Sequence, residues 1–545
     1  MPYRTASLSM ARAAALLAAL SSLAFGGLLA GRRPPAARAG VSQVSIMMDD
    51  DRLLYRSDRT RVRTLLEMKK LGVQVIRVTM LWNVVAGTAH STPAHRRRFR
   101  AQQPNTYPRG SWDRYDLLDR EASGIGISVY FDVTGPGPSW THAAPPANDR
   151  KDKRTWKPSS SEFYKFVLAA GRRYSGTSVD RQKQLIPRVT IWSLWNEPNQ
   201  GGWLTPQWER HGSTLIAESP IIYRQLYLAG RRALDDSGHG TDIIMAGETA
   251  PLGSTRHDSR SAMFPAKFIR ELMCVNDGGQ PYTGGAAGAR DCSAFDRLGP
   301  LRASAWAHHP YTKKVAPNVR DSHRDSITMA NIGELPKLLD NLAAATGHIA
   351  PGLPIVSSEF GYETNPPDPF NGMPLSKQAD WINIGDFLAF VNPRVVGQTQ
   401  FQLFDAPPLR QYPATSKKHW FTYQAGLLFA NGRPKPSLTT YELPFFAFPA
   451  KKDPATNYPR VGVWGQLRFH DGLISTRSPD QVQIEFRAAG SGAWQPLGPA
   501  LAVTNREGFF FAALPVPGAG AVRAHWAQTG QADHISRAVP VAAGG

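Results

Sequence analysis

Eight short runs of apolar and β-branched residues, separated by stretches of helical periodicity, occupy the chain from about residue 42 to 445. This alternation is typical of parallel βα units, and eight units is the number that closes a (β/α)8 barrel. Spacing alone would also suit a doubly wound open sheet. The predicted strands begin near Val44, Val73, Ile127, Val189, Ile243, Ala303, Leu353 and Val395.

The first 39 residues have the organisation of a secretory signal peptide. Basic residues precede an apolar stretch at 13–30, and Ala37-Arg38-Ala39 is a small-residue cleavage site. The alternative is an uncleaved membrane anchor held by Arg32 and Arg33, because the apolar stretch is long for a signal. We therefore expect an exported protein, secreted or anchored at its N-terminus.

Composition divides the remaining chain into three parts. Residues 40–448 contain the eight predicted strands and form the predicted barrel. Prolines then punctuate a predicted linker at 449–460, and from about Val461 brief alternating runs with Gly and Pro turns continue to residue 545. Short alternating runs separated by such turns predict a small C-terminal β-sandwich that packs against the barrel or holds a polymer.

Charge and cysteine content restrict the partners. The formal charge of +20 can favour polyanions, but no nucleic-acid-binding motif is found. Cys274 and Cys292, in a Gly-rich segment of an exported chain, predict one loop-closing disulfide, with two free thiols as the alternative. No His/Cys cluster has zinc spacing and no phosphate-binding loop occurs, so we expect no metal, cofactor or nucleic-acid partner.

Two predicted strands end in a glutamate. The run from Val189 closes in Trp195-Asn196-Glu197-Pro198, and the run from Leu353 closes in Ser358-Glu359-Phe360-Gly361. Pro198 cannot donate to a continuing ladder, so Glu197 lies where a buried strand emerges. Barrel chemistry takes place at the C-terminal ends of the strands, and the two positions therefore favour the barrel over the open sheet.

Both motifs resemble those of the clan A glycoside hydrolases, the retaining (β/α)8-barrel enzymes that include families 5 and 39. The resemblance implies that Glu197 is the acid/base, that Asn196 binds the sugar 2-hydroxyl, and that Glu359 is the nucleophile. Two carboxyl groups are needed because the glycosidic bond breaks through an oxocarbenium-like state, which requires an acid and an anion. An O-glycosidase that acts on cell-wall oligo- or polysaccharide by double displacement, without a cofactor, is the implied function.

Two further elements resemble the clan. In His308-His309-Pro310-Tyr311, the resemblance implies that Tyr311 bonds the nucleophile and that His309 contacts the sugar or the acid/base. Arg77 stands inside an apolar strand, where its charge must meet a carboxylate. The clan's equivalent arginine supports the nucleophile, and an ion pair with a strand acid such as Asp132 is the alternative.

Aromatic residues are candidates for sugar subsites, because the C–H face of a sugar stacks on a ring. We expect Trp82 and Trp140 to contact substrate, and Trp203 and Trp420 are further candidates, with plain packing as the alternative for each. Asp49, Asp50 and Asp51 either bind terminal hydroxyls or form a solvated turn, and Glu248 is a lesser polar candidate. Many family 5 members have a Trp at the end of strand 8, where this chain has Gln402-Leu403-Phe404-Asp405, so glucan specificity is in doubt.

Basic clusters at residues 96–100 and 150–154 follow the second and third strands and are expected on the catalytic face. They indicate a carbohydrate substrate that is acidic or heavily decorated. Two alternatives remain, a non-catalytic wall-polysaccharide binding protein and a transglycosylase. The presence of both glutamates, Asn196 and Tyr311 favours an enzyme, because binding alone needs no matched acid and nucleophile.

Overall fold

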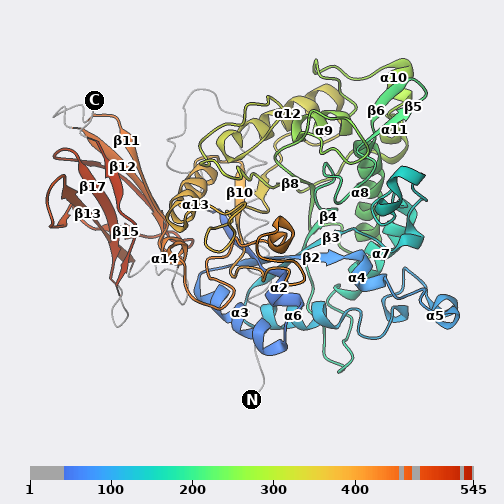
Figure 1. Ribbon diagram of the computed structural model, residues 1–545, viewed down its shortest axis with the longest axis horizontal. Coiled ribbons are helices and arrows are strands. Elements are labelled where there is room, and N and C mark those ends of the chain that lie inside the picture. Colours follow the sequence, from blue (N-terminus) through green and yellow to red (C-terminus); the bar gives the residue numbers. More distant parts are fainter. Residues whose placement is uncertain (1–41, 453–458, 469–478, 528–532, 543–545) are drawn as a thin grey trace.

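The computed structural model describes residues 42–452, 459–468, 479–527 and 533–542, so the predicted signal peptide lies outside the described residues. Eight parallel strands close into a barrel in chain order, and the last pairs with the first (Figure 1). The predicted closed barrel is confirmed, and the open sheet is excluded. Its strands are β1 (Val44–Met48), β2 (Val75–Leu81), β3 (Ser128–Thr134), β4 (Ile191–Leu194), β7 (Ile243–Thr249), β8 (Ala305–His308), β9 (Ile355–Ser357) and β10 (Val395–Phe401).

Helices surround the barrel, and most of them bury an apolar face against it (Figure 1). In the longest of the early ones, α7, the Ser159 side chain caps the N-terminus by accepting from the Glu162 amide, and Phe163 and Phe166 are fully buried. The helices are α2 (Asp50–Leu54), α3 (Asp58–Lys70), α4 (Trp82–Ala86), α5 (Pro93–Arg98), α6 (Asp113–Gly124), α7 (Ser160–Arg173), α8 (Glu218–Asp236), α9 (Pro265–Leu272), α10 (Gly284–Gly288), α11 (Ala294–Leu298), α12 (Glu334–Thr346), α13 (Leu375–Phe390) and α14 (Pro436–Glu442).

The interior of the barrel changes character along the strands. Toward their N-terminal ends it is filled by apolar side chains, including Val44, Ile191 and Val356. Toward their C-terminal ends the buried positions are polar, as with Arg77 and Asp132, which are fully buried. Buried charges require partners, so this polar layer must be internally paired.

The C-terminal domain consists of two antiparallel sheets with a common apolar core, as the sequence predicted. One sheet contains β11 (Phe445–Ala450), β12 (Arg460–Gln466) and β16 (Phe509–Pro515). The predicted boundary at Val461 is too late, because β11 pairs in register with β12 and the domain therefore begins inside the stretch assigned to barrel and linker. The other sheet contains β13 (Asp480–Ala488), β14 (Gln495–Pro496), β15 (Leu501–Val503), β17 (Gly520–Trp526), β18 (His534–Ile535) and β19 (Val539–Val541).

This domain packs against the barrel through α13 (Figure 1). Trp464 of β12 lies against Phe390 and Phe387 of α13, with ring centroids 5.5 and 5.8 Å apart. The buried side chains of Arg468 and Asp386 form an ion pair of 3.2 Å beside it. An apolar contact with a buried ion pair fixes the position of the sandwich on the barrel.

Two elements outside the barrel strands complete the fold. A short hairpin of β5 (Trp208–His211) and β6 (Thr214–Ala217) precedes α8. The predicted disulfide is present between Cys274 and Cys292, and it closes the loop that carries α10.

In the part of the chain that the structure describes, no helix combines the length and the apolar composition needed to cross a membrane.

Candidate active site

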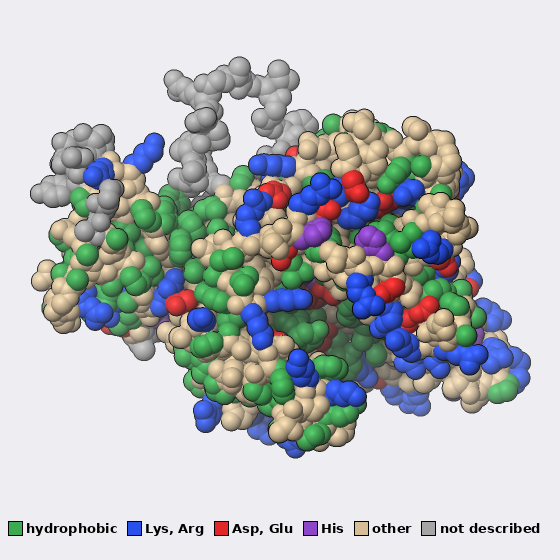
Figure 2. All heavy atoms as spheres, turned by 45° about the horizontal axis from the view of Figure 1, so that its top comes forward, with side chains coloured by type: hydrophobic (Ala, Val, Ile, Leu, Met, Phe, Trp, Pro, Cys, Tyr) green, Lys and Arg blue, Asp and Glu red, His purple; other side chains and the backbone are tan. Residues whose placement is uncertain are grey.

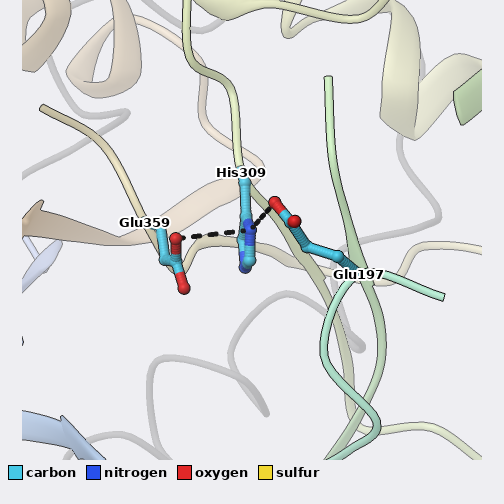
Figure 3. Close-up of side chains that lie close together, drawn as sticks. All are labelled: Glu197, His309 and Glu359. Carbon is cyan, nitrogen blue, oxygen red and sulfur yellow. Dashed lines mark hydrogen bonds and ion pairs between the residues drawn. The ribbon is translucent and has the colours of Figure 1, made fainter. Parts of the chain in front are cut away.

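Glu197 and Glu359 lie in one cavity at the C-terminal ends of the barrel strands. Glu197 follows β4 by three residues and Glu359 follows β9 by two, and both line a cavity of about 900 Å³. A carboxylate oxygen of each lies within 4.8 Å of the other, with His309 between them (Figure 3). Two carboxyl groups from non-adjacent strands therefore face one reaction volume.

Arg77 is fully buried beside this cavity and connects the acids around it. Its Nη1 donates to Glu359 Oε1 at 2.8 Å, and its Nη2 donates to Asn196 Oδ1 at 2.7 Å. Asp132 Oδ2 and Glu248 Oε2 lie 3.1 and 3.2 Å from the same Nη2. The guanidinium thus pairs with Glu359 and also with the strand acid Asp132, the two kinds of partner that the sequence offered as alternatives.

Glu248 is the centre of the buried network. The sequence indicated it only as a lesser polar candidate. It receives hydrogen bonds from Ser193 and Ser358 at 2.7 Å each, and a further one from Tyr130. Burial opposes its charge, but Arg77 and His309 lower the pKa of Glu248 below its usual range. This carboxylate is thus a permanent anion that holds the two cations in place, and it does not line the cavity.

His309 links Glu248 to Glu197. Its Nε2 lies 2.7 Å from Glu248 Oε2 and its Nδ1 lies 2.9 Å from Glu197 Oε1. Burial alone would lower the pKa of His309, but the surrounding Glu359, Glu197 and Glu248 raise it to about 10. The ring is therefore an imidazolium at neutral pH, and it donates from both nitrogens.

Its neighbour His308 has a different role. The His308 ring bonds Thr249 Oγ1 at 2.8 Å and the Ile327 carbonyl at 2.9 Å, and it does not line the cavity. Burial lowers the pKa of His308 to about 3, so it is neutral and structural. The choice of His309 over His308 agrees with these contacts.

Tyr311 and Asn196 complete the surroundings of the two glutamates. The Tyr311 hydroxyl donates to Glu359 Oε2 at 3.0 Å, so Glu359 receives one donor on each oxygen. The Asn196 carbonyl is taken by Arg77, which leaves its NH2 to donate to a ligand. Positive φ angles of 76° at Trp195 and 39° at Glu197 turn the backbone sharply here, a strained conformation that is common at functional sites.

We expected Trp82 and Trp140 to contact substrate, but neither residue lines the cavity. Trp82 begins α4, which turns its ring outward onto Phe166 of α7, and only 1% of it is exposed. Trp140 stacks on His90 with centroids 3.9 Å apart and does not line the cavity either. Which way a side chain leaves a strand-end loop depends on the local helix, a feature that composition does not reveal.

Other aromatic residues provide the apolar wall. Trp203 lines the cavity, as do Phe401 at the end of β10 and Tyr423 from the following loop. The Phe401 and Tyr423 rings meet edge to face at 5.2 Å. Trp420, the fourth candidate, lies outside the cavity lining.

Of the three aspartates after β1, only Asp50 lines the cavity. Its carboxylate accepts from the Thr79 amide at 3.3 Å, and burial raises its pKa to about 6. Asp49 caps α2 and also accepts from the Phe404 amide, while Asp51 pairs with Arg56 at 2.8 Å. Glu363, which no pattern singled out, also lines the cavity, and burial raises its pKa to about 7.

Among the residues that the structure describes, two clusters of carboxylates and a histidine have spacing that a metal ion could use. In Glu197, His309 and Glu359, the imidazolium and Arg77 already supply positive charge. In the second cluster, Glu209, His211 and Glu218, the Lys157 ammonium lies 2.5 Å from Glu209. The cations in or beside these two clusters oppose the binding of a metal ion there.

No protein-family model and no curated protein matches this sequence. Among solved structures, it is similar to a family 39 glycoside hydrolase from Bacteroides cellulosilyticus WH2, at 12% identity over 89% of this chain and 82% of that one, with a TM-score of 0.46. It is similar to GH5_18 from Streptomyces cattleya in complex with GlcNAc, at 15% identity over 73% and 78%, with a TM-score of 0.41. A monomeric β-xylosidase from Caulobacter crescentus CB15 shares 13% identity over 88% and 95%, with a TM-score of 0.41. The fold class of this chain, a (β/α)8 barrel, is defined by its own closed sheet.

Proposed function

We propose that this protein is a retaining O-glycoside hydrolase. The observation that carries the proposal is that Glu197 and Glu359, from the fourth and seventh barrel strands, face one cavity and bring a carboxylate oxygen of each within 4.8 Å of the other. Retaining glycosidases hold their two carboxyl groups about 5 to 5.5 Å apart, whereas inverting ones need about 6.5 to 9.5 Å to seat a water between carboxylate and sugar. The short separation supports direct attack by one glutamate on the anomeric carbon.

Glu359 is the nucleophile in this proposal. Arg77 and Tyr311 each donate to one of its oxygens, and these two bonds aim the carboxylate at the anomeric carbon. Attack forms a glycosyl-enzyme ester as the bond to the leaving oxygen breaks. The same two donors receive the carboxylate when water cleaves the ester.

Glu197 is the acid/base. His309 donates to its Oε1, which leaves Oε2 to carry the transferable proton. That proton passes to the leaving oxygen in the first step, and Glu197 takes a proton from the attacking water in the second. Asn196 is placed beside it to donate to a sugar hydroxyl.

A screen of aryl hexosides, pentosides and arabinofuranosides tests the activity. We expect hydrolysis that Glu359→Ala abolishes, while Glu197→Ala still reacts slowly with good leaving groups and is rescued by azide. Proton NMR of the first-formed sugar, before mutarotation, should show the substrate's anomeric configuration. The opposite anomer would overturn double displacement.

The same screen separates the alternatives. A chain that binds wall polysaccharide but hydrolyses no glycoside is a binding protein, and products longer than the substrate identify a transglycosylase. We also propose that the protein is exported, on the basis of residues 1–39. If the protein recovered from the culture medium has an intact mass that lacks residues 1–39, export with cleavage is supported.

A further inference from the structure

A second cavity, of about 400 Å³, adjoins the catalytic one on the same face of the barrel. Leu81 lines both cavities, and the short segment Gly201–Gly202 that lines the second lies between Gln200 and Trp203, which line the first. This is the size range of small-molecule sites. A chain of sugars in the catalytic cavity could therefore continue into the second one.

The second cavity is positively charged. Its lining contains Lys151, Arg154 and Arg260 and a single acid, Asp152. Asp152 is buried and pairs with Arg260, which leaves Lys151 and Arg154 uncompensated. In the described ranges of the chain neither of these two side chains has an ion pair. Figure 2 shows a face of the molecule on which Lys and Arg side chains border a hollow.

The walls are held by contacts between loops that follow different strands. The loop after β3 is tied to the loop after β7 through Asp152 and Arg260, and through a 2.8 Å bond from Ser259 to Asp149. Thr155 of the first loop meets Thr205 at 2.9 Å. At Gly201 a Cβ would come within 2.3 Å of the Arg260 carbonyl oxygen, so the loops are closely packed. The two free cations therefore project from a fixed frame.

We propose that this cavity is a subsite for an anionic substituent, a carboxylate or a sulfate ester, on the glycan whose cleavage we propose above. The inference rests on that function and names its substrate class. Cations in a concave site focus the field on an approaching anion, and a guanidinium matches a carboxylate or sulfate with paired donors. Arg150 and Lys153 belong to the same loop but do not line the cavity.

Binding, measured without turnover, tests the inference. The full chain carrying Glu359→Gln is titrated calorimetrically with oligogalacturonate and glucuronoxylan oligosaccharides, each beside its carboxyl-reduced form, and with κ-carrageenan oligosaccharides beside their desulfated form. We expect at least one anionic form to bind about three- to tenfold more tightly than its neutral form, and salt to reduce the difference. The pair that responds identifies the anion.

The double variant Lys151→Gln, Arg154→Gln should remove that difference, whereas Arg150→Gln, Lys153→Gln, which changes the net charge equally in the same loop, should keep it. Equal loss in both variants would show a nonspecific charge effect and overturn the subsite, as would equal affinity for every charged and neutral pair. If the anionic preference appears but the parent chain hydrolyses nothing, the hydrolase is wrong and the subsite stands.

Discussion

The imidazole of His309 lies 2.7 Å from Glu248, an acid that never reaches the cavity, and 2.9 Å from Glu197, which lines it. A buried anion thus fixes the ring that contacts the proposed acid/base. Glu248 holds His309 and Arg77 in position. The contacts of these two residues with Glu197 and Glu359 therefore depend on Glu248.

His309 predicts a pH dependence of stability. Its folded-state pKa of about 10 lies above the unfolded value near 6.5, so its contribution is fully present below about pH 6.5 and is lost as the pH rises toward 10. Between pH 7 and 9, stability should fall with pH more steeply in the parent than in His309→Gln. The difference should approach one proton, about 1.4 kcal/mol per pH unit, in urea denaturation.

His308→Gln is the matched control for that experiment. His308 is equally buried, but its pKa is lowered to about 3, so it is neutral in both states above pH 7. Its removal should leave the slope between pH 7 and 9 unchanged. Identical slopes in the parent and in His309→Gln would contradict the assigned charge.

Tyr311→Phe should reduce turnover without loss of the fold. It removes one hydrogen bond to the Glu359 carboxylate, and bonds to charged groups contribute about 1.5 to 3 kcal/mol. We therefore expect kcat to fall about tenfold to a hundredfold on an aryl glycoside that the parent cleaves. Tyr164→Phe removes a tyrosine–carboxylate bond to Asp236, outside the site, and should leave kcat unchanged. Comparable losses in both variants would count against a specific role.

The disulfide should stabilise the protein without serving catalysis. It closes a loop with a sequence separation of 18 residues, outside the lining of the catalytic cavity. In the chain-entropy description, such a loop contributes about 3 kcal/mol. Cys274→Ser with Cys292→Ser should lower the thermal midpoint and leave kcat/KM near the parent value. An unchanged midpoint would show that the bond does not constrain the unfolded chain.

Trp464 should couple the sandwich to the barrel. It is 1% exposed and packs on α13, so Trp464→Ala should cost about 3 to 5 kcal/mol. We expect calorimetry of Trp464→Ala to resolve separate unfolding transitions for the barrel and the sandwich. Phe511, the residue opposite on β16, is 42% exposed, and Phe511→Ala should cost far less. A single unshifted transition for Trp464→Ala would show that the domains are coupled elsewhere.

The sequence alone determined the barrel and the positions of Glu197 and Glu359. Strand period and turn chemistry are local, and a parallel barrel brings all of its strand ends to one face, so a glutamate that ends a strand must lie there. The pairing of Cys274 with Cys292 followed from there being only two cysteines.

Only the tertiary structure decided which side chains meet. Glu248 stands in an apolar run like many structural residues, and its central place follows from the register that brings β7 beside β4 and β8. Trp82 was expected in the cavity and is in the core, because α4 turns its side chain away. β11 was missed because its pairing with β12 is set by contacts across the sheet. Local patterns specify where an element begins and ends, whereas the direction and partners of its side chains depend on non-local packing.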